Sequence, residues 1–324
     1  MGTLRRTTIA YVAGLVLLAC QPLPAQQASS SGAMPYLHLG TPHRILPVAQ
    51  AWEGNEFPHT MSILEFKHDG YRYWGWYGLN MGGGIGLARS NDLVHWTKFE
   101  KNPLWKNARW PSVLSVKDHH HSQFLYFAIT RNYDTNSSYI VSATSRDGIH
   151  LVQKKTLVSA VPNQRNQNPN LFRDPQTGRY YLTFYRGNDN DHFDIVSKSA
   201  ASIDDLDKAP EKVLLKSTTT VAAPTLLYVK HAPNQSRKQN GVYYLATEIY
   251  PARYTNDPGS EWQVEVFASD APDGEFKPVA GNPVMKGQRA CLFQNIFRGR
   301  FYGFDCHLVS PEHWVLEEVE APLP

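Results

Sequence analysis

Short apolar segments alternate with polar turns along most of this chain, and the alternation repeats as a unit. Each unit opens with a short apolar strand, most often after a proline, and continues through a polar turn into an aromatic strand. Aromatic and β-branched runs between turns rich in glycine, asparagine and aspartate favour strands. The opening strands are residues 58–64, 111–114, 169–172, 224–227 and 291–293, and the aromatic strands are residues 71–77, 124–127, 180–185, 243–246 and 301–304.

A third strand in each unit ends in serine and leads into a turn through aspartate or glycine. Ser90, Asp92 and Trp96 mark the first copy of this phrase, and residues 145–151 and 269–276 repeat it. A unit that returns every roughly 40–60 residues indicates an array of similar modules. A fourth strand follows the turn.

Five such units predict an all-β fold: a five-bladed β-propeller of four-stranded antiparallel blades around a central funnel. Radial repetition favours this fold because it leaves only short exposed edges. The fifth unit ends near Pro324 before its fourth strand, so we expect residues 44–48 to supply the outer strand and close the ring. No helix is expected beyond a turn near residues 201–206.

Composition fits one domain with a large core. The chain has 324 residues, of which 42% are hydrophobic and 12% aromatic. The formal net charge of +3 is spread out, without a block of lysine and arginine, so nucleic acid is not an expected partner. We expect a monomeric propeller over residues 44–324.

The first 20 residues have the features of an export signal. Arg5 and Arg6 precede an apolar stretch, residues 9–18, that is too short to span a bilayer. Residues 17–20 resemble a bacterial lipobox, which implies a lipid on Cys20 as the membrane contact and a place at the outer membrane or in the periplasm. Cleavage after Ala25 would instead release a soluble periplasmic or secreted protein. Residues 21–43 predict a flexible tether.

Two further cysteines lie on a predicted hairpin that turns at residues 298–299. This register places Cys291 opposite Cys306, close enough to form a disulfide in an oxidising compartment. Two buried free thiols are the alternative, since cross-strand bridges are often strained.

The phrase at residues 90–96 and the tyrosine-rich strand that follows Gly178 carry a resemblance to a known group. Both resemble the five-bladed glycosidases of the arabinanase/levansucrase/invertase type, a clan that includes glycoside hydrolase families 43, 32, 68, 117 and 130. The resemblance extends over roughly residues 44–320. It implies an exported glycoside hydrolase that acts on an oligosaccharide or polysaccharide, although one fold can host many functions.

In the resembled clan, the starts of the first strands and the ends of the second strands face the active site. Glycoside cleavage needs two carboxyl groups, one kept protonated and the other ionised. We expect Glu56 to be the base or nucleophile. Glu248 ends an apolar strand, where burial disfavours the ionised form, and this suits a general acid. Asp305 is expected to support either one.

Two positions depart from the clan's pattern. Asn168 and Ala222 stand where the clan usually has carboxylates, which favours a second reading as a carbohydrate-binding propeller without catalysis. A third reading is a glycoside phosphorylase, with Arg109, Arg186 and Arg289 forming a cationic phosphate site.

Several polar and aromatic residues at the same strand ends suit sugar hydroxyl groups or sugar rings. Trp52, Trp76 and Trp110 offer stacking faces or, alternatively, fill the cores of the blades. The expected substrate-binding residues are His59, Arg109, Trp110, Asn168, Arg186, Asp189, Arg289 and His307.

Other conspicuous residues are expected to have structural roles. Residues 119–121 are three histidines in a turn that lacks a partner at ligand spacing, so no metal site is predicted. The glycines at residues 82–86 predict a loop at the funnel rim, because no helix follows them to bind phosphate. Asp174 is expected in the turn away from the funnel. No cofactor is predicted, and a calcium ion in the channel has no dedicated signal.

Overall fold

The computed structural model describes most of the chain from residue 43 onward. The predicted export signal, Cys20 and residues 21–42 of the tether lie outside the described residues, as does Cys291. Within the described ranges, no helix is long and apolar enough to cross a membrane. The described ranges are 43–46, 49–56, 58–79, 83–117, 123–132, 135–188, 193–217, 219–230, 241–250, 262–286, 295–297, 300–310 and 313–322, with side chains from 44 to 284.

The described strands form five antiparallel sheets. In four of them the four strands follow sequence order, and the fifth ends with the N-terminal strand β1. Two sheets have an extra short strand. The first sheet contains β2 (Pro58–His68), β3 (Tyr71–Leu79), β4 (Gly84–Ser90) and β5 (Trp96–Lys98), with β6 (Trp105–Lys106) beside β4. The second contains β7 (Ala108–Lys117), β8 (Gln123–Arg131), β9 (Tyr139–Ser145) and β10 (Val152–Val158). The third contains β11 (Arg165–Arg173), β12 (Tyr180–Gly187), β13 (Phe193–Ala200) and β14 (Glu211–Leu215).

The fourth sheet has the same strand order, and the fifth takes β1 as its outer strand. The fourth contains β15 (Thr220–Lys230), β16 (Gly241–Tyr250), β17 (Gln263–Ser269) and β18 (Lys277–Pro278), with β19 (Met285–Lys286) beside β17. The fifth contains β20 (Asn295–Phe297), β21 (Arg300–Ser310), β22 (His313–Pro322) and β1 (His43–Ile45). Two single-turn 3-10 helices, η1 (Ala51–Glu53) and η2 (Ile203–Asp205), complete the described elements.

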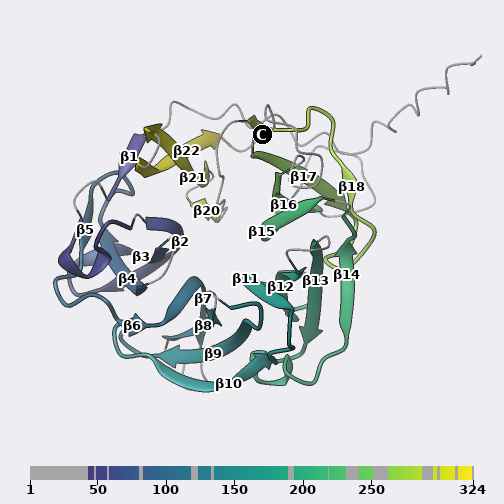
Figure 1. The fold of residues 1–324 in the computed structure, drawn as a ribbon, viewed down its shortest axis with the longest axis horizontal. Helices are drawn as coiled ribbons and strands as arrows, with labels where there is room; N and C mark the ends of the chain where they lie inside the picture. The colour runs from purple at the N-terminus through teal and green to yellow at the C-terminus, as the bar shows by residue number, and fades with distance from the viewer. Residues whose placement is uncertain are drawn as a thin grey trace, which may run out of the picture. The chain divides into compact units, whose positions relative to one another are not determined.

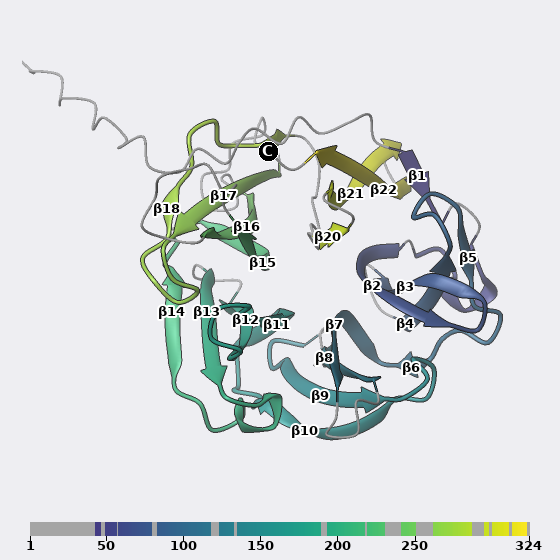
Figure 2. The same cartoon turned by 180° about the vertical axis from the view of Figure 1, so that it is seen from behind.

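The sheets are arranged radially within the unit that spans residues 32–324. In Figure 1, β2, β7, β11 and β15 lie on the inside and β5, β10, β14 and β18 on the outside, and Figure 2 shows the same order from behind. The inner strands contact one another in chain order: β2 with β7, β7 with β11, and β11 with β15. The fold is therefore an all-β propeller with four-stranded blades, as the repeat predicts.

The last sheet takes its outer strand from the other end of the described chain. β1 pairs antiparallel with β22, with His43 opposite Glu318 and Ile45 opposite Leu316. The same strand β22 pairs with β21 on its other side. The prediction that an N-terminal segment completes the last unit is confirmed.

Aromatic side chains fill the space between neighbouring sheets. Trp76 is fully buried in a cluster shared by the first and second sheets, packs edge-to-face on Phe127 at 5.4 Å and donates to the Gly148 carbonyl at 2.8 Å. Such pairs add to the hydrophobic stabilisation of the contact. Of the two readings of Trp76, a place in the blade core is therefore confirmed.

The prediction of a rim loop at the glycines near residue 84 is wrong for part of this segment. Gly84 and Gly86 lie within strand β4, not in a rim loop, while Gly83 precedes the strand. A Cβ atom on Gly86 would lie 2.3 Å from the Tyr77 ring, and one on Gly84 would lie 2.2 Å from the Trp105 carbonyl. These glycines allow close packing inside the first sheet, which a turn-oriented reading of the sequence overlooks.

The repeated serine–aspartate phrase is a turn with its own hydrogen bonds. Asp92 Oδ1 accepts from the backbone N–H groups of Val94 at 2.9 Å and His95 at 2.8 Å, and Ser90 Oγ accepts from Leu93 N at 2.9 Å. Side chains that satisfy nearby backbone donors stabilise such turns. The second copy makes the same contacts through Ser145, Asp147 and His150.

Asp174 lies in the turn between β11 and β12, as expected. Its buried carboxylate accepts from Tyr243 Oη at 2.7 Å, from Thr177 Oγ1 at 2.5 Å and from Gln176 N at 3.0 Å. Burial raises the pKa of Asp174, but these hydrogen bonds outweigh burial and lower it. The residue thus joins the third and fourth sheets at the end where β11 finishes.

We predict that Asp174→Asn destabilises the fold by about 1–3 kcal/mol, because it removes hydrogen bonds to a charged acceptor. Since the folded-state pKa is depressed, the contribution is complete above the unfolded value of about 3.9 and is lost as pH falls through the folded pKa. Urea unfolding between pH 2 and 7 should show a shallower acid limb in the variant. The exposed Asp270→Asn should leave this profile unchanged, and equal profiles for both variants would contradict the prediction.

Candidate active site

A repeated side-chain hydrogen bond sets the inner strands side by side. Ser62 Oγ accepts from Val113 N at 3.1 Å, and Ser112 Oγ accepts from Leu171 N at 2.8 Å. The third copy joins Asn170 Oδ1 to Leu226 N at 3.0 Å. Each of these hydrogen bonds contributes about 1 kcal/mol of net stability and satisfies a buried backbone N–H group. The four inner strands therefore begin at one end of the sheets, which we call the start end.

At the start end, the pairing register slips in the same place in four successive sheets. The slips fall between Pro58 and Thr60, Arg109 and Ser112, Gln167 and Asn170, and Ala222 and Thr225. Three of the bulged positions are followed by proline, which has no N–H to donate to the ladder. Bulges of this kind redirect side chains and are frequent beside active sites.

The bulges hold three non-glycine residues in the left-handed region. Trp110, Asn168 and Ala223 have φ values of 49°, 51° and 46°. Each precedes a proline, and such a conformation costs about 1–3 kcal/mol per residue unless the surroundings impose it. The same strained backbone conformation recurs in three successive sheets, which indicates that one structural constraint acts on all of these strand starts.

His59, Arg109 and Trp110 form one cluster at this end. The Arg109 guanidinium lies 4.1 Å from the Trp110 ring centroid and its Nε donates to the Leu79 carbonyl at 2.9 Å. Trp110 Nε1 donates to His59 Nδ1 at 3.3 Å. All three predicted substrate-binding residues are buried, and the structure brings them together across β2 and β7.

The next inner strand contributes amides. Gln167 accepts a short hydrogen bond from Tyr185 Oη and donates to Ser138 Oγ at 2.9 Å. Asn168 follows at the bulge and is 4% exposed. After Arg165, this strand therefore presents neutral amide donors and acceptors, and no carboxylate, at the start end.

Arg186 is held within the third sheet. Its guanidinium binds Glu211 of β14 at 2.5 and 2.7 Å, and its Nε donates to Asn166 Oδ1 at 3.0 Å. The Arg186 hydrogen bonds lower the pKa of the Glu211 carboxyl. Arg186, a predicted substrate-binding residue, thus forms an ion pair between β12 and β14. None of these contacts joins it to the cluster of His59, Arg109 and Trp110.

Glu248 lies near the end of β16 and is 2% exposed. It pairs with Ala222, at the position where the third sheet pairs Tyr185 with Gln167. Because alanine is smaller and has no polar side-chain atom, it neither fills the volume that glutamine fills nor hydrogen-bonds the carboxyl group. The fourth sheet thus carries its buried carboxyl group on the second strand.

Glu248 is distinct among the buried acids. Within the described residues, the buried acidic side chains are Glu53, Asp174 and Glu248. Glu53 is bound to a lysine, and Asp174 lies at the opposite end of the sheets. Glu248 is therefore the buried acid that the described structure places at the start end of the inner strands.

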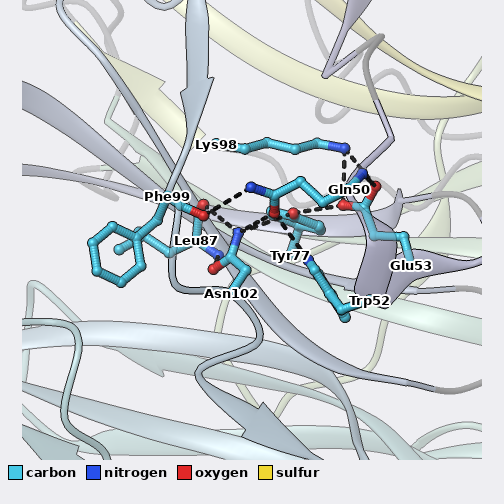
Figure 3. Close-up of polar contacts among 8 residues, drawn as sticks. All are labelled: Gln50, Trp52, Glu53, Tyr77, Leu87, Lys98, Phe99 and Asn102. Carbon is cyan, nitrogen blue, oxygen red and sulfur yellow. Dashed lines mark hydrogen bonds and ion pairs between the residues drawn. The ribbon is translucent and has the colours of Figure 1, made fainter.

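Glu56 is held by the segment that precedes β2. Its backbone N–H donates to the Glu53 carbonyl at 3.0 Å, directly after the single turn of η1. Glu53 itself accepts from Lys98 Nζ at 2.8 Å through both oxygens and from Tyr77 Oη at 2.7 Å (Figure 3). Glu56 is partly exposed.

A wider network fixes the same segment on the first sheet. Gln50 Oε1 accepts from Trp52 Nε1 at 2.9 Å and from Asn102 Nδ2 at 3.0 Å, while Gln50 Nε2 donates to the Phe99 carbonyl at 2.9 Å (Figure 3). Burial lowers the pKa of Lys98, and the neighbouring Glu53 opposes this shift. No sequence pattern marked this network, since Glu53 and Lys98 lie far apart in the chain and neither belongs to a motif.

The structure describes only the backbone of two predicted site residues and nothing of two others. Asp189 and Arg289 lie outside the described residues. Asp305 and His307 belong to β21, opposite Glu317 and Val315, and their side chains lie outside the described part. Residues 119–121 are also outside it. Among the described residues, no group of three or more histidine, cysteine, aspartate or glutamate side chains is arranged to hold a metal ion.

The family model for glycosyl hydrolases family 43 matches residues 54–295. The chain belongs to this family of glycoside hydrolases. A search of curated proteins gave no match.

Solved structures share the fold at low sequence identity. A thermostable family-43 glycoside hydrolase has a TM-score of 0.60 and 14% identity, with 86% of this chain and 91% of that chain covered. An endo-1,4-beta-xylanase from Bacteroides thetaiotaomicron has a TM-score of 0.54 and 18% identity, covering 82% and 91%. A family-43 endo-arabinanase from Bacillus licheniformis has a TM-score of 0.56 and 14% identity, covering 82% and 93%.

We predict that Lys98→Met lowers the free energy of unfolding by about 3–5 kcal/mol, because it leaves the buried Glu53 carboxylate without its cation. Adding Glu53→Gln to this variant should restore much of the loss. Denaturant unfolding of the two single variants and the double variant measures the coupling.

The exposed pair Arg72–Glu65, at 2.8 Å, offers a matched control. Arg72→Met should change stability by no more than about 1 kcal/mol. A Lys98→Met loss as small as this one would show that the buried pair does not anchor the segment before β2.

Proposed function

We propose that the protein hydrolyses a glycosidic bond in an oligosaccharide or polysaccharide, with Glu248 as the general acid. The observation that carries the proposal is the buried position of Glu248 opposite Ala222 at the start end. Burial favours the protonated form of a carboxyl group, which a general acid needs before it protonates the leaving oxygen.

Glu56 is proposed as the base or nucleophile, supported by its fixed backbone and partial exposure beside β2. Asp305, in the middle of strand β21, would support either carboxyl group. The clustered His59, Arg109 and Trp110 would bind sugar hydroxyl groups and a ring face. Asn168, Arg186, Asp189, Arg289 and His307 complete the proposed binding set.

We further propose that the five sheets are the five blades of one ring, closed by β1. The protein would be exported and act as a monomer in the periplasm or at the outer membrane, held there by a lipid on Cys20, or as a secreted protein. The sequence features of residues 1–25 support this part of the proposal.

The family and its solved structures guide the choice of substrates. Arabinose- and xylose-containing saccharides are the first to test, because the structural relatives include proteins named as an arabinanase and a xylanase. Aryl arabinosides and xylosides report the cleavage of one bond, and five-unit arabino- and xylo-oligosaccharides report action on a chain.

We predict that Glu248→Gln lowers kcat by about 10²–10⁴-fold with little change in melting temperature, since the amide cannot supply the proton. The loss should be smaller for a dinitrophenyl glycoside, whose leaving group needs little protonation. Glu265→Gln, in the neighbouring strand β17, is the matched control and should retain the parent rate. Near-parent rates for Glu248→Gln on oligosaccharides would reject Glu248 as the acid.

The same assays separate the other readings. Turnover that requires phosphate would identify a phosphorylase. Thermal stabilisation by a saccharide without turnover of any substrate would identify a binding propeller, for which Asn168 and Ala222 are the motivating observations.

A further inference from the structure

Two aromatic rings stack at the start end of the fourth sheet. The rings of Tyr250 and Trp262 lie 5.0 Å apart between centroids with planes inclined by 24°. Tyr250 ends β16, and Trp262 directly precedes β17. They meet because Ile249 pairs with Gln263 at the adjacent position. Both side chains are partly exposed.

The stacked pair lies on the same face of the sheet as Glu248. Strand β16 pairs without a register slip from residue 243 to 249, so its side chains alternate between faces. Tyr244 and Ala246 pack in one cluster, whereas Leu245 and Ile249 pack in another that includes third-sheet residues. Glu248 and Tyr250 continue the row of Tyr244 and Ala246, about 7 Å apart, which is two residues' rise along a strand.

This pair differs from the aromatic contacts that fill the cores. Trp76 on Phe127 and Tyr185 on Phe193 are T-shaped contacts among buried rings. Among the ring pairs of the described residues, Tyr250 with Trp262 is the one with nearly parallel planes, and it belongs to none of the core clusters. A near-parallel, partly exposed pair offers a flat apolar face beside a polar group, as ligand sites do.

We propose that Tyr250 and Trp262 form a sugar-binding platform, a subsite for the saccharide unit next to the one whose bond Glu248 protonates. The apolar C–H face of a sugar ring would pack on the aromatic surface, and two residues' rise along β16 would separate this unit from the reacting bond. The inference rests on the proposed function. It makes the protein selective for substrates of two or more sugar units on that side.

The test separates binding from turnover. In the Glu248→Gln background, the affinity for xylopentaose and arabinopentaose is measured by calorimetry before and after adding Trp262→Ala or Tyr250→Ala. Each addition should weaken binding of the preferred pentasaccharide about tenfold, the typical effect of losing an aromatic contact. With Glu248 intact, each should raise KM for that pentasaccharide and leave its kcat within about twofold.

Two controls guard against loss of structure. Phe124→Ala removes a ring from the Phe124–Tyr126 pair, with centroids 5.2 Å apart, near the start of β8 and thus at the other end of the sheets. It should change neither affinity nor KM. Trp262→Phe keeps an aromatic face and should recover most of the affinity.

Unchanged pentasaccharide affinity in Trp262→Ala and Tyr250→Ala would overturn the platform, and so would an equal loss of affinity in Phe124→Ala. Absence of binding of both pentasaccharides to the protein with intact aromatic residues would overturn it too. These outcomes do not depend on the role of Glu248. Full activity of Glu248→Gln would reject the proposed mechanism. The pentasaccharide affinities of the Trp262→Ala and Tyr250→Ala variants would still show whether the two rings bind the saccharide.

Discussion

The hydrogen bond from the side chain of one inner strand to the backbone of the next is the constraint on which the site depends. Ser62, Ser112 and Asn170 each accept from the following sheet at the same level. The bulges begin three or four residues before these acceptors, so the bulged backbones are fixed relative to strands far apart in the chain. Trp110 contacts His59 because the hydrogen bond between Val113 and Ser62 fixes the alignment of β7 against β2.

The repeat made the architecture predictable. Alternating apolar and polar positions, prolines ahead of inner strands and the serine–aspartate turns each have a local physical cause, and local causes can be read from sequence. The position of Asp174 was also predictable, because Gly178 and Tyr180 follow it too closely to leave room for anything but a turn. The apolar segment at residues 44–48 could be predicted as the outer strand of the last unit.

The pairings between distant residues were not predictable. Nothing local marks Glu53 as the partner of Lys98, or Glu211 as the partner of Arg186, because each pair forms only when the strands of a sheet are assembled. The glycines at 84 and 86 were misread, since a glycine that allows a ring to approach looks the same in sequence as one that turns the chain. The burial of Glu248 could be anticipated because it ends an apolar strand, whereas its pairing with Ala222 depends on the register of two strands.

The outer strand β1 has a consequence for how the chain folds. Hairpins within each sheet join residues close in sequence, whereas β1 must meet β22 across almost the whole described chain, at a larger loop-closure entropy. That contact should therefore be among the last to form. Interactions that are absent from the folding transition state slow unfolding without speeding folding. The join between the two chain ends would thus govern the lifetime of the native state more than its rate of formation.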